Sequence, residues 1–191
     1  MSAAIGHNNG PSMEVGHKWR TFQWQKAREA AMPKSIPLMV VKMRVKRARE
    51  LGLDYKAYAA IRQATGRDIL ALLFSSNALR VVRANAPQIP MREAEVLNAV
   101  QGAQKLALVY RPLDPTAIES ANAILDFVGH APKFTDSWSD MRDHLCGAVQ
   151  GRKLVGDQVL IIGDTAIERD WSAASKAAGY LEAGRYFGAG V

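Results

Sequence analysis

Cysteine is almost absent from the sequence, because Cys146 is the only one among 191 residues. One thiol cannot form an intramolecular disulfide, and it excludes the four-cysteine class of zinc sites. A single free thiol is typical of a reducing compartment, and no apolar stretch of the signal-peptide kind opens the chain. We therefore expect a cytoplasmic protein.

Long hydrophobic runs and familiar catalytic motifs are also missing. The longest apolar run covers residues 69–74, and a compact one covers residues 159–162; both are far short of the roughly 20 residues of a membrane-spanning helix. There is no phosphate-binding loop, and His144 and Cys146 stand two apart on an expected helix, where they point in different directions. We expect no membrane partner, no catalytic residue, no metal and no cofactor; whether the protein is an enzyme stays open, with a non-enzyme favoured.

Positive charge, in contrast, is abundant in one half of the chain. Residues 18–83 carry 15 Lys and Arg against 4 Asp and Glu, whereas residues 84–191 carry 10 against 13. Such asymmetry indicates a part that meets a polyanion, and duplex DNA is the nucleic acid that we expect first. A solvated basic surface without a specific partner, a membrane surface and an acidic protein are the alternative explanations of the charge.

The order of expected elements predicts an α+β fold that is predominantly helical. Residues 1–17 are predicted to be a flexible tail, residues 18–84 a basic helical module, and residues 85–191 a small α/β or mostly helical module. The last module is the expected place for a homodimer or protein contact. Helices are expected near residues 18–32, 35–51, 55–64, 67–76, 91–102, 115–127, 136–148 and 170–180, and strands near 106–110 and 158–162.

The corner between the second and third expected helices has a distinctive pattern. Ala48 is small where two helices would cross, Gly52 suits a left-handed turn, and Asp54 is a suitable N-cap. Leu51, Leu53, Tyr58 and Ile61 fall at interior positions, whereas Arg47 stands where an apolar residue is expected. Over about 20 residues this pattern resembles the helix-turn-helix class of DNA-binding proteins. An ordinary corner of two helices is the alternative.

The resemblance implies which side chains would contact DNA. Tyr55, Lys56, Ala60 and Gln63 would face the major groove, and Lys42, Lys46 and Arg49 would contact phosphates. Arg62 and Arg67 are suited to either role, and Arg44 widens the basic face. The function implied is a small DNA-binding transcription regulator of bacterial or phage type, as found on mobile elements. The alternative is an inhibitor or adaptor that presents its cationic face to a larger complex.

A third hypothesis comes from residues 159–165, an apolar strand that ends in Gly163 and Asp164 before an alanine-rich stretch. This looks like the last motif of haloacid-dehalogenase-type phosphatases, and it implies Asp164 as a magnesium ligand with Glu168 at a second position. The family also needs a nucleophilic Asp-x-Asp pair, which the sequence lacks, since Asp136 and Asp140 stand four apart. The alternative is a turn whose Asp164 and Thr165 cap a helix.

Overall fold

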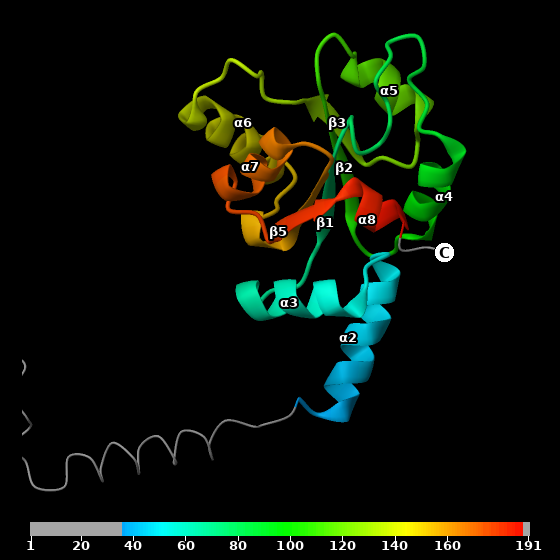
Figure 1. Cartoon of the computed structure of the whole chain (residues 1–191), viewed down its shortest axis with the longest axis vertical. Helices are drawn as coiled ribbons and strands as arrows, with labels where there is room; N and C mark the ends of the chain where they lie inside the picture. Colours follow the sequence, from blue (N-terminus) through cyan, green and yellow to red (C-terminus); the bar gives the residue numbers. More distant parts are fainter. Residues whose placement is uncertain (1–35, 189–191) are drawn as a thin grey trace, which may run out of the picture. The chain divides into compact units, whose positions relative to one another are not determined.

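The computed structural model describes residues 36–188 (Figure 1). The chain divides into two compact units, Met1–Val41 and Lys42–Val191. The second unit contains every strand that the structure describes. The expected tail over residues 1–17 and the expected helix over residues 18–32 lie outside the described residues.

A five-stranded parallel sheet forms the centre of the second unit, with the strand order β3-β2-β1-β4-β5 (Figure 1). In the middle, Leu73 of β1 stands opposite Leu106 of β2 on one side and Ile161 of β4 on the other. Hydrogen bonds of the sheet therefore join residues 71–75 to segments on the far side of residue 84. The strands are β1 (Ala71–Ser75), β2 (Gln104–Val109), β3 (Phe127–His130), β4 (Val159–Gly163) and β5 (Gly179–Glu182).

Helices precede the sheet and connect its strands. Within residues 36–188, two of them come before β1, and the others follow the strands in turn. A short 3-10 turn, Gly156–Gln158, leads into β4. The helices are α2 (Leu38–Glu50), α3 (Tyr55–Thr65), α4 (Met91–Ala99), α5 (Pro115–Ala121), α6 (Trp138–Gln150), α7 (Ala166–Ala174) and α8 (Ala183–Gly188).

Both faces of the sheet are covered, because successive side chains of a strand point to opposite faces. Leu72 and Phe74 belong to a core cluster that includes residues of α4, α5 and α8. Ala71 and Leu73 belong to a second cluster with residues of α6 and α7. Figure 1 shows α4 and α5 on one side of the sheet and α6 and α7 on the other. The fold is therefore a doubly wound α/β fold.

The prediction of a predominantly helical α+β fold with a helical N-terminal module is wrong. The apolar segment that we expected to be a helix over residues 67–76 contains β1, the central strand of the sheet. All five residues of β1 are buried. A strand buried on both faces is apolar throughout and lacks the alternation that marks a half-buried strand, so its sequence also suits a buried helix.

The helix-turn-helix interpretation is wrong as well, although the local corner is present. Gly52 has a φ of 68°, and Asp54 caps α3 by accepting a hydrogen bond from the backbone N–H of Lys56 at 3.2 Å. The corner is nevertheless part of the α/β core, since Ala48 and Leu51 lie in the same cluster as Phe74. Small residues and a turn glycine specify how two helices meet, and they leave open what the pair packs against.

Other expected elements are confirmed with shifted bounds. The strands β2 and β4 and the helices α4 and α6 lie within a few residues of their expected positions. Two strands were missed, because β3 and β5 fall at the ends of segments that we expected to be helical, 115–127 and 170–180. Within residues 36–188, every helix falls short of the length and apolarity that a bilayer crossing demands.

Candidate functional site

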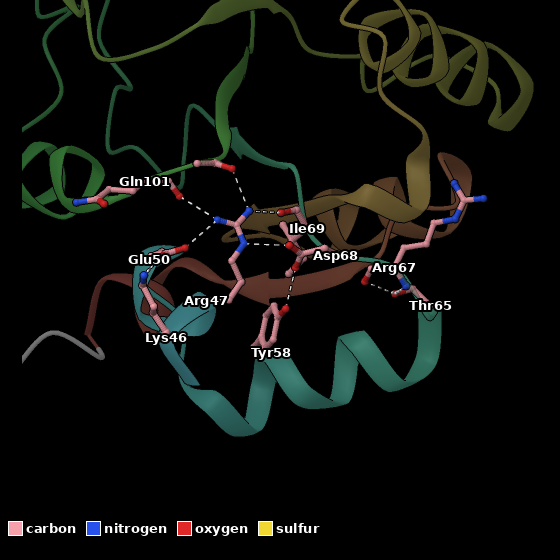
Figure 2. A network of polar contacts seen from close by, with 10 residues as sticks. Lys46, Arg47, Glu50, Tyr58, Thr65, Arg67, Asp68, Ile69 and Gln101 are labelled. Carbon is pink, nitrogen blue, oxygen red and sulfur yellow. Dashed lines mark hydrogen bonds and ion pairs between the residues drawn. The ribbon is translucent and has the colours of Figure 1, made fainter. Parts of the chain in front are cut away.

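The guanidinium of Arg47 fastens α2 to the amino edge of the sheet (Figure 2). The side chain is only 17% exposed, and each of its five N–H donors has an acceptor within 3.3 Å. This explains the departure from the expected apolar residue, since a fully satisfied arginine is tolerated where a lone charge is not. The acceptors are the carboxylates of Asp68 and Glu50 and the backbone oxygens of Ile69, Gln101 and Gly102.

Asp68 extends this network to α3. One carboxylate oxygen accepts from Arg47 Nε at 3.0 Å, and the other accepts from the hydroxyl of Tyr58 at 2.8 Å. Burial, and then the hydrogen bond to Asp68, raises the pKa of Tyr58 to about 12. Gly102 also belongs to this arrangement, because it has a φ of 66° and a Cβ there would lie 2.8 Å from Arg47 Nη1. Two helices are thus held to the sheet by one partly buried polar cluster.

The predicted nucleic-acid-binding side chains lie around this cluster on two successive helices. On α2, Lys42, Lys46 and Arg49 are exposed and share one side of the helix, being spaced four and three residues apart. On α3, Lys56 and Gln63 are exposed and lie one above the other, two turns apart. The structure therefore groups the set by helix. The remaining members are Arg67, exposed just after α3, and Arg44, Tyr55 and Arg62, which are half-buried.

Ion pairs distinguish these cations from one another. Lys46 lies 3.8 Å from Glu50, and Arg67 lies 3.2 Å from Asp157. Among the residues that the structure describes, no carboxylate lies within 4 Å of Lys42, Arg44, Arg49, Lys56 or Arg62. Most of the predicted set is consequently available to an external anion.

A second polar cluster lies at the carboxyl edge of the sheet, where β1 and β4 end side by side. The chain continues from β1 to β2 in one direction along the sheet and from β4 to β5 in the opposite direction. Open α/β sheets bind ligands at such switch points. Here the protein's own side chains fill the position. Arg80 Nη1 lies 2.7 Å from a carboxylate oxygen of Asp164, and Asn77 donates to the carboxylate of Glu168 at 2.8 Å.

Glu168 is fully buried and satisfied by the protein. Its second oxygen accepts from the backbone N–H groups of Asp164 and Thr165, at 2.6 Å and 3.1 Å. These amides precede α7, and free amides at a helix start are the groups that bind phosphates in many nucleotide sites. An internal carboxylate therefore takes the place of an external anion.

The residues at this edge do not fit the magnesium site of the phosphatase hypothesis. Asp164 follows an apolar strand, as that resemblance implies, but its carboxylate pairs with Arg80. The adjacent strand β1 is followed by Ser76 and Asn77, so no carboxylate nucleophile stands beside Asp164. Within residues 36–188 there is no cluster of three or more His, Cys, Asp or Glu side chains arranged to hold a metal.

Asp136 and Asp140 have structural roles outside that edge. Asp136 accepts from the backbone N–H of Lys133 at 2.8 Å, and Asp140 completes the capping box of α6 with Ser137. The expected helix after Asp164 begins earlier than predicted, because Thr165 caps α7 through the backbone N–H of Glu168. The alternative of a capping turn is thus confirmed for Thr165.

Sequence reasoning missed the polar residues at the carboxyl ends of β1 to β3. Asn77, Arg80, Arg111 and His130 belong to none of the sites predicted from the sequence. Each follows or ends a strand, which is the signal that would have found them. That signal depends on recognising β1 and β3 as strands, and neither was recognised.

By its fold the chain belongs to the class of doubly wound α/β proteins, with a parallel sheet crossed by helices on both faces. Comparison with protein-family models, with curated proteins and with solved structures gave no match to the chain in any of the three.

Proposed function

We propose that the chain binds the phosphate backbone of nucleic acid through exposed and half-buried cations of α2 and α3. The observation that carries the proposal is that most of these cations have no carboxylate partner within residues 36–188. Phosphate binding requires cations that can release their small counter-ions to the polymer. We call these residues the α2–α3 cationic surface: Lys42, Arg44, Lys46, Arg49, Lys56 and Arg62.

The local charge balance supports this choice of partner. From Lys42 to Thr65 the chain has seven Lys and Arg and only two acidic residues, Glu50 and Asp54. Asp54 is committed to capping α3, and Glu50 accepts from Arg47. Neither carboxylate neutralises Lys42 or Arg49. A cationic surface in which Lys46 alone has a carboxylate partner among the described residues favours a polyanion over an uncharged ligand.

The anchoring of α2 supports the proposal in a second way. Lys42, Lys46 and Arg49 extend over about 10 Å of helix, since each residue rises about 1.5 Å. The Arg47 cluster holds the same helix against the sheet (Figure 2). Cations on a fixed helix bind phosphates with less loss of conformational freedom than cations on a flexible chain.

The proposed contacts are to the backbone and do not read sequence. Phosphate contacts set position, whereas base contacts specify sequence. A regulatory role on DNA therefore needs a base-reading element in addition to the α2–α3 cationic surface. The proposal covers the contacts between cations and phosphates, and it assigns no base contact to Tyr55 or Gln63.

The test is a triple variant, Lys42→Ala with Lys46→Ala and Arg49→Ala, measured by fluorescence anisotropy on a labelled duplex. We expect the wild type to bind with a steep salt dependence between about 50 and 200 mM salt. The variant should bind at least tenfold more weakly at low salt. Its slope of log K against log salt should be shallower by about three, since roughly one counter-ion is released for each phosphate contact.

The matched control removes three exposed cations elsewhere: Arg92→Ala, Lys133→Ala and Arg142→Ala. It has the same net charge as the first variant and should keep most of the wild-type slope. Equal losses in both variants would mean that net charge alone governs binding. If the wild type does not bind the duplex at low salt, the proposal is overturned. The alternative of an adaptor that presents its cationic face to a protein is then favoured.

A further inference from the structure

The carboxyl edge of the sheet has a second part, at the ends of β2 and β3. Its first part, at the ends of β1 and β4, is filled by the Arg80–Asp164 pair and by Glu168. At the ends of β2 and β3 the surface is instead hollowed, with a volume of about 460 Å³. This volume lies within the range of about 300–1,000 Å³ that is usual for small-molecule sites. The hollow is lined by Arg111, Pro112, Leu113, Asp114 and His130.

Arg111 supplies a positive charge to the hollow. It is exposed, and no carboxylate among residues 36–188 lies within 4 Å of it. The one acidic residue in the lining, Asp114, caps α5 by accepting from the backbone N–H of Thr116 at 3.0 Å. Arg80, at the neighbouring part of the same edge, is paired. The guanidinium of Arg111 therefore stands ready for an external anion.

His130 adds an uncommitted ring nitrogen to the same hollow. It follows Val128 by two positions in β3, so its side chain leaves the sheet on the face of Val128 and Leu113, which share a core cluster. Neither ring nitrogen has a hydrogen-bond partner among the described residues. Nδ1 is buried, so Nε2 is the ring nitrogen that a ligand in the hollow can reach.

The backbone of His130 is held in place from α6. The imidazole Nε2 of His144 donates to the carbonyl oxygen of His130 at 2.7 Å. The end of β3 is thereby fixed relative to the hollow. A site whose backbone is held in place while the imidazole of His130 has no protein partner is preformed for a ligand.

We propose that this hollow binds a small anionic molecule through its oxyanion group, a phosphate ester or a carboxylate. The planar guanidinium of Arg111 matches either oxyanion with two parallel hydrogen bonds. His130 donates a further hydrogen bond, and Pro112 and Leu113 contact the apolar part of the molecule. The site shares no residue with the α2–α3 cationic surface, and it is independent of the proposed nucleic-acid binding.

The experiment is a nuclear magnetic resonance titration of the full chain with inorganic phosphate, and in a second arm with acetate. The readouts are the side-chain signals of Arg111 Nε–H and of the His130 ring. We expect a saturable shift of both signals in at least one arm, and a response in only one arm tells phosphate from carboxylate. In Arg111→Gln the His130 shift should lose saturation and weaken at least tenfold, with an unchanged thermal unfolding midpoint.

The matched control is Arg92→Gln, which removes an exposed cation of α4. It should leave both shifts as in the wild type. The proposal is overturned if neither probe gives a saturable shift in the wild type. It is also overturned if Arg111→Gln responds as strongly as Arg92→Gln. In a second variant, His130→Asn, the added anion should shift the Arg111 signal less than in the wild type. Without anion, the Arg111 signal should stay where it is in the wild type.

Discussion

Arg47 is the residue on which the position of α2 depends. Its guanidinium meets acceptors from α2 itself, from the segment before β1 and from the turn before β2. A lysine in its place has one ammonium group with three donors, and so it leaves acceptors unmet. The corner of two helices is therefore specified by a polar side chain as much as by Gly52.

Replacing Arg47 with methionine tests this interpretation. Methionine keeps the helix propensity and the apolar stem but leaves the Asp68 carboxylate and three backbone oxygens without their donor. We expect a loss of about 2–4 kcal/mol in the free energy of unfolding, because half-buried partners are left unsatisfied. The measurement is urea denaturation followed by circular dichroism.

The matched control is Arg49→Met, two residues along the same helix, where the side chain is exposed and has no ion pair among the described residues. Its unfolding free energy should stay within about 0.5 kcal/mol of the wild type. Equal effects of the two substitutions would contradict the assigned role of Arg47.

Among the elements, the junction of β4 with α7 depends on Glu168. This carboxylate satisfies two backbone amides before α7 and also holds Asn77, which follows β1. It thereby ties the ends of the two central strands together. An exposed capping box closes only its own helix, whereas this one closes a helix and joins two strands.

The capping boxes of α6 and α7 allow a direct comparison. Glu168→Ala should lower the free energy of unfolding by about 2–4 kcal/mol, since three part-buried donors lose the carboxylate that accepts from them. Asp140→Ala removes the equivalent residue from the exposed box of α6 and should cost about 0.5–1 kcal/mol. Chemical denaturation of both variants is the measurement. Similar losses would show that the link from Asn77 to Glu168 contributes little.

The sequence predicts an element well when neighbouring residues determine it, and poorly when distant segments do. The cap Asp54 binds the backbone two residues ahead, and β4 is a compact apolar strand, so both were predicted correctly. The strand β1 was not predicted, because its apolar run forms a strand only by pairing with β2 and β4, which are distant in the sequence. β3 and β5 have four residues each and include glycine, which weakens the strand pattern.

The candidate sites follow the same rule. The exposed cations of α2 and α3 can be found from charge and helical spacing, which are local properties. Arg111 and His130 belong together only because β2 and β3 are neighbours in the sheet. No spacing in the sequence connects them, so the hollow at the ends of these strands could not be foreseen.

On the scale of the whole molecule, the sheet joins the basic first half of the chain to the rest. Leu72 and Phe74 of β1 are buried in one core cluster with Leu160 and Ile162 of β4. A fragment of residues 1–84 contains β1 without either neighbouring strand. We expect this fragment to show no cooperative unfolding and poor dispersion of amide signals, because the burial of β1 is lost.

The comparison is the full chain under the same conditions, measured by heteronuclear magnetic resonance and thermal denaturation. A dispersed spectrum with a cooperative transition in the fragment would show that residues 18–84 fold as a module of their own. A soluble fragment that still binds duplex without folding would separate the charge of this segment from its structure.

The position of β1 between β2 and β4 has a consequence for protein synthesis. Ser75 and Val159 are 84 positions apart, so the ribosome makes the central strand long before one of its two neighbours. At about 5–20 residues per second, this interval lasts on the order of ten seconds. During that time one edge of β1 presents unpaired backbone groups, to which other growing chains can pair. The yield of this protein in a cell is therefore sensitive to the supply of chaperones that bind extended apolar segments.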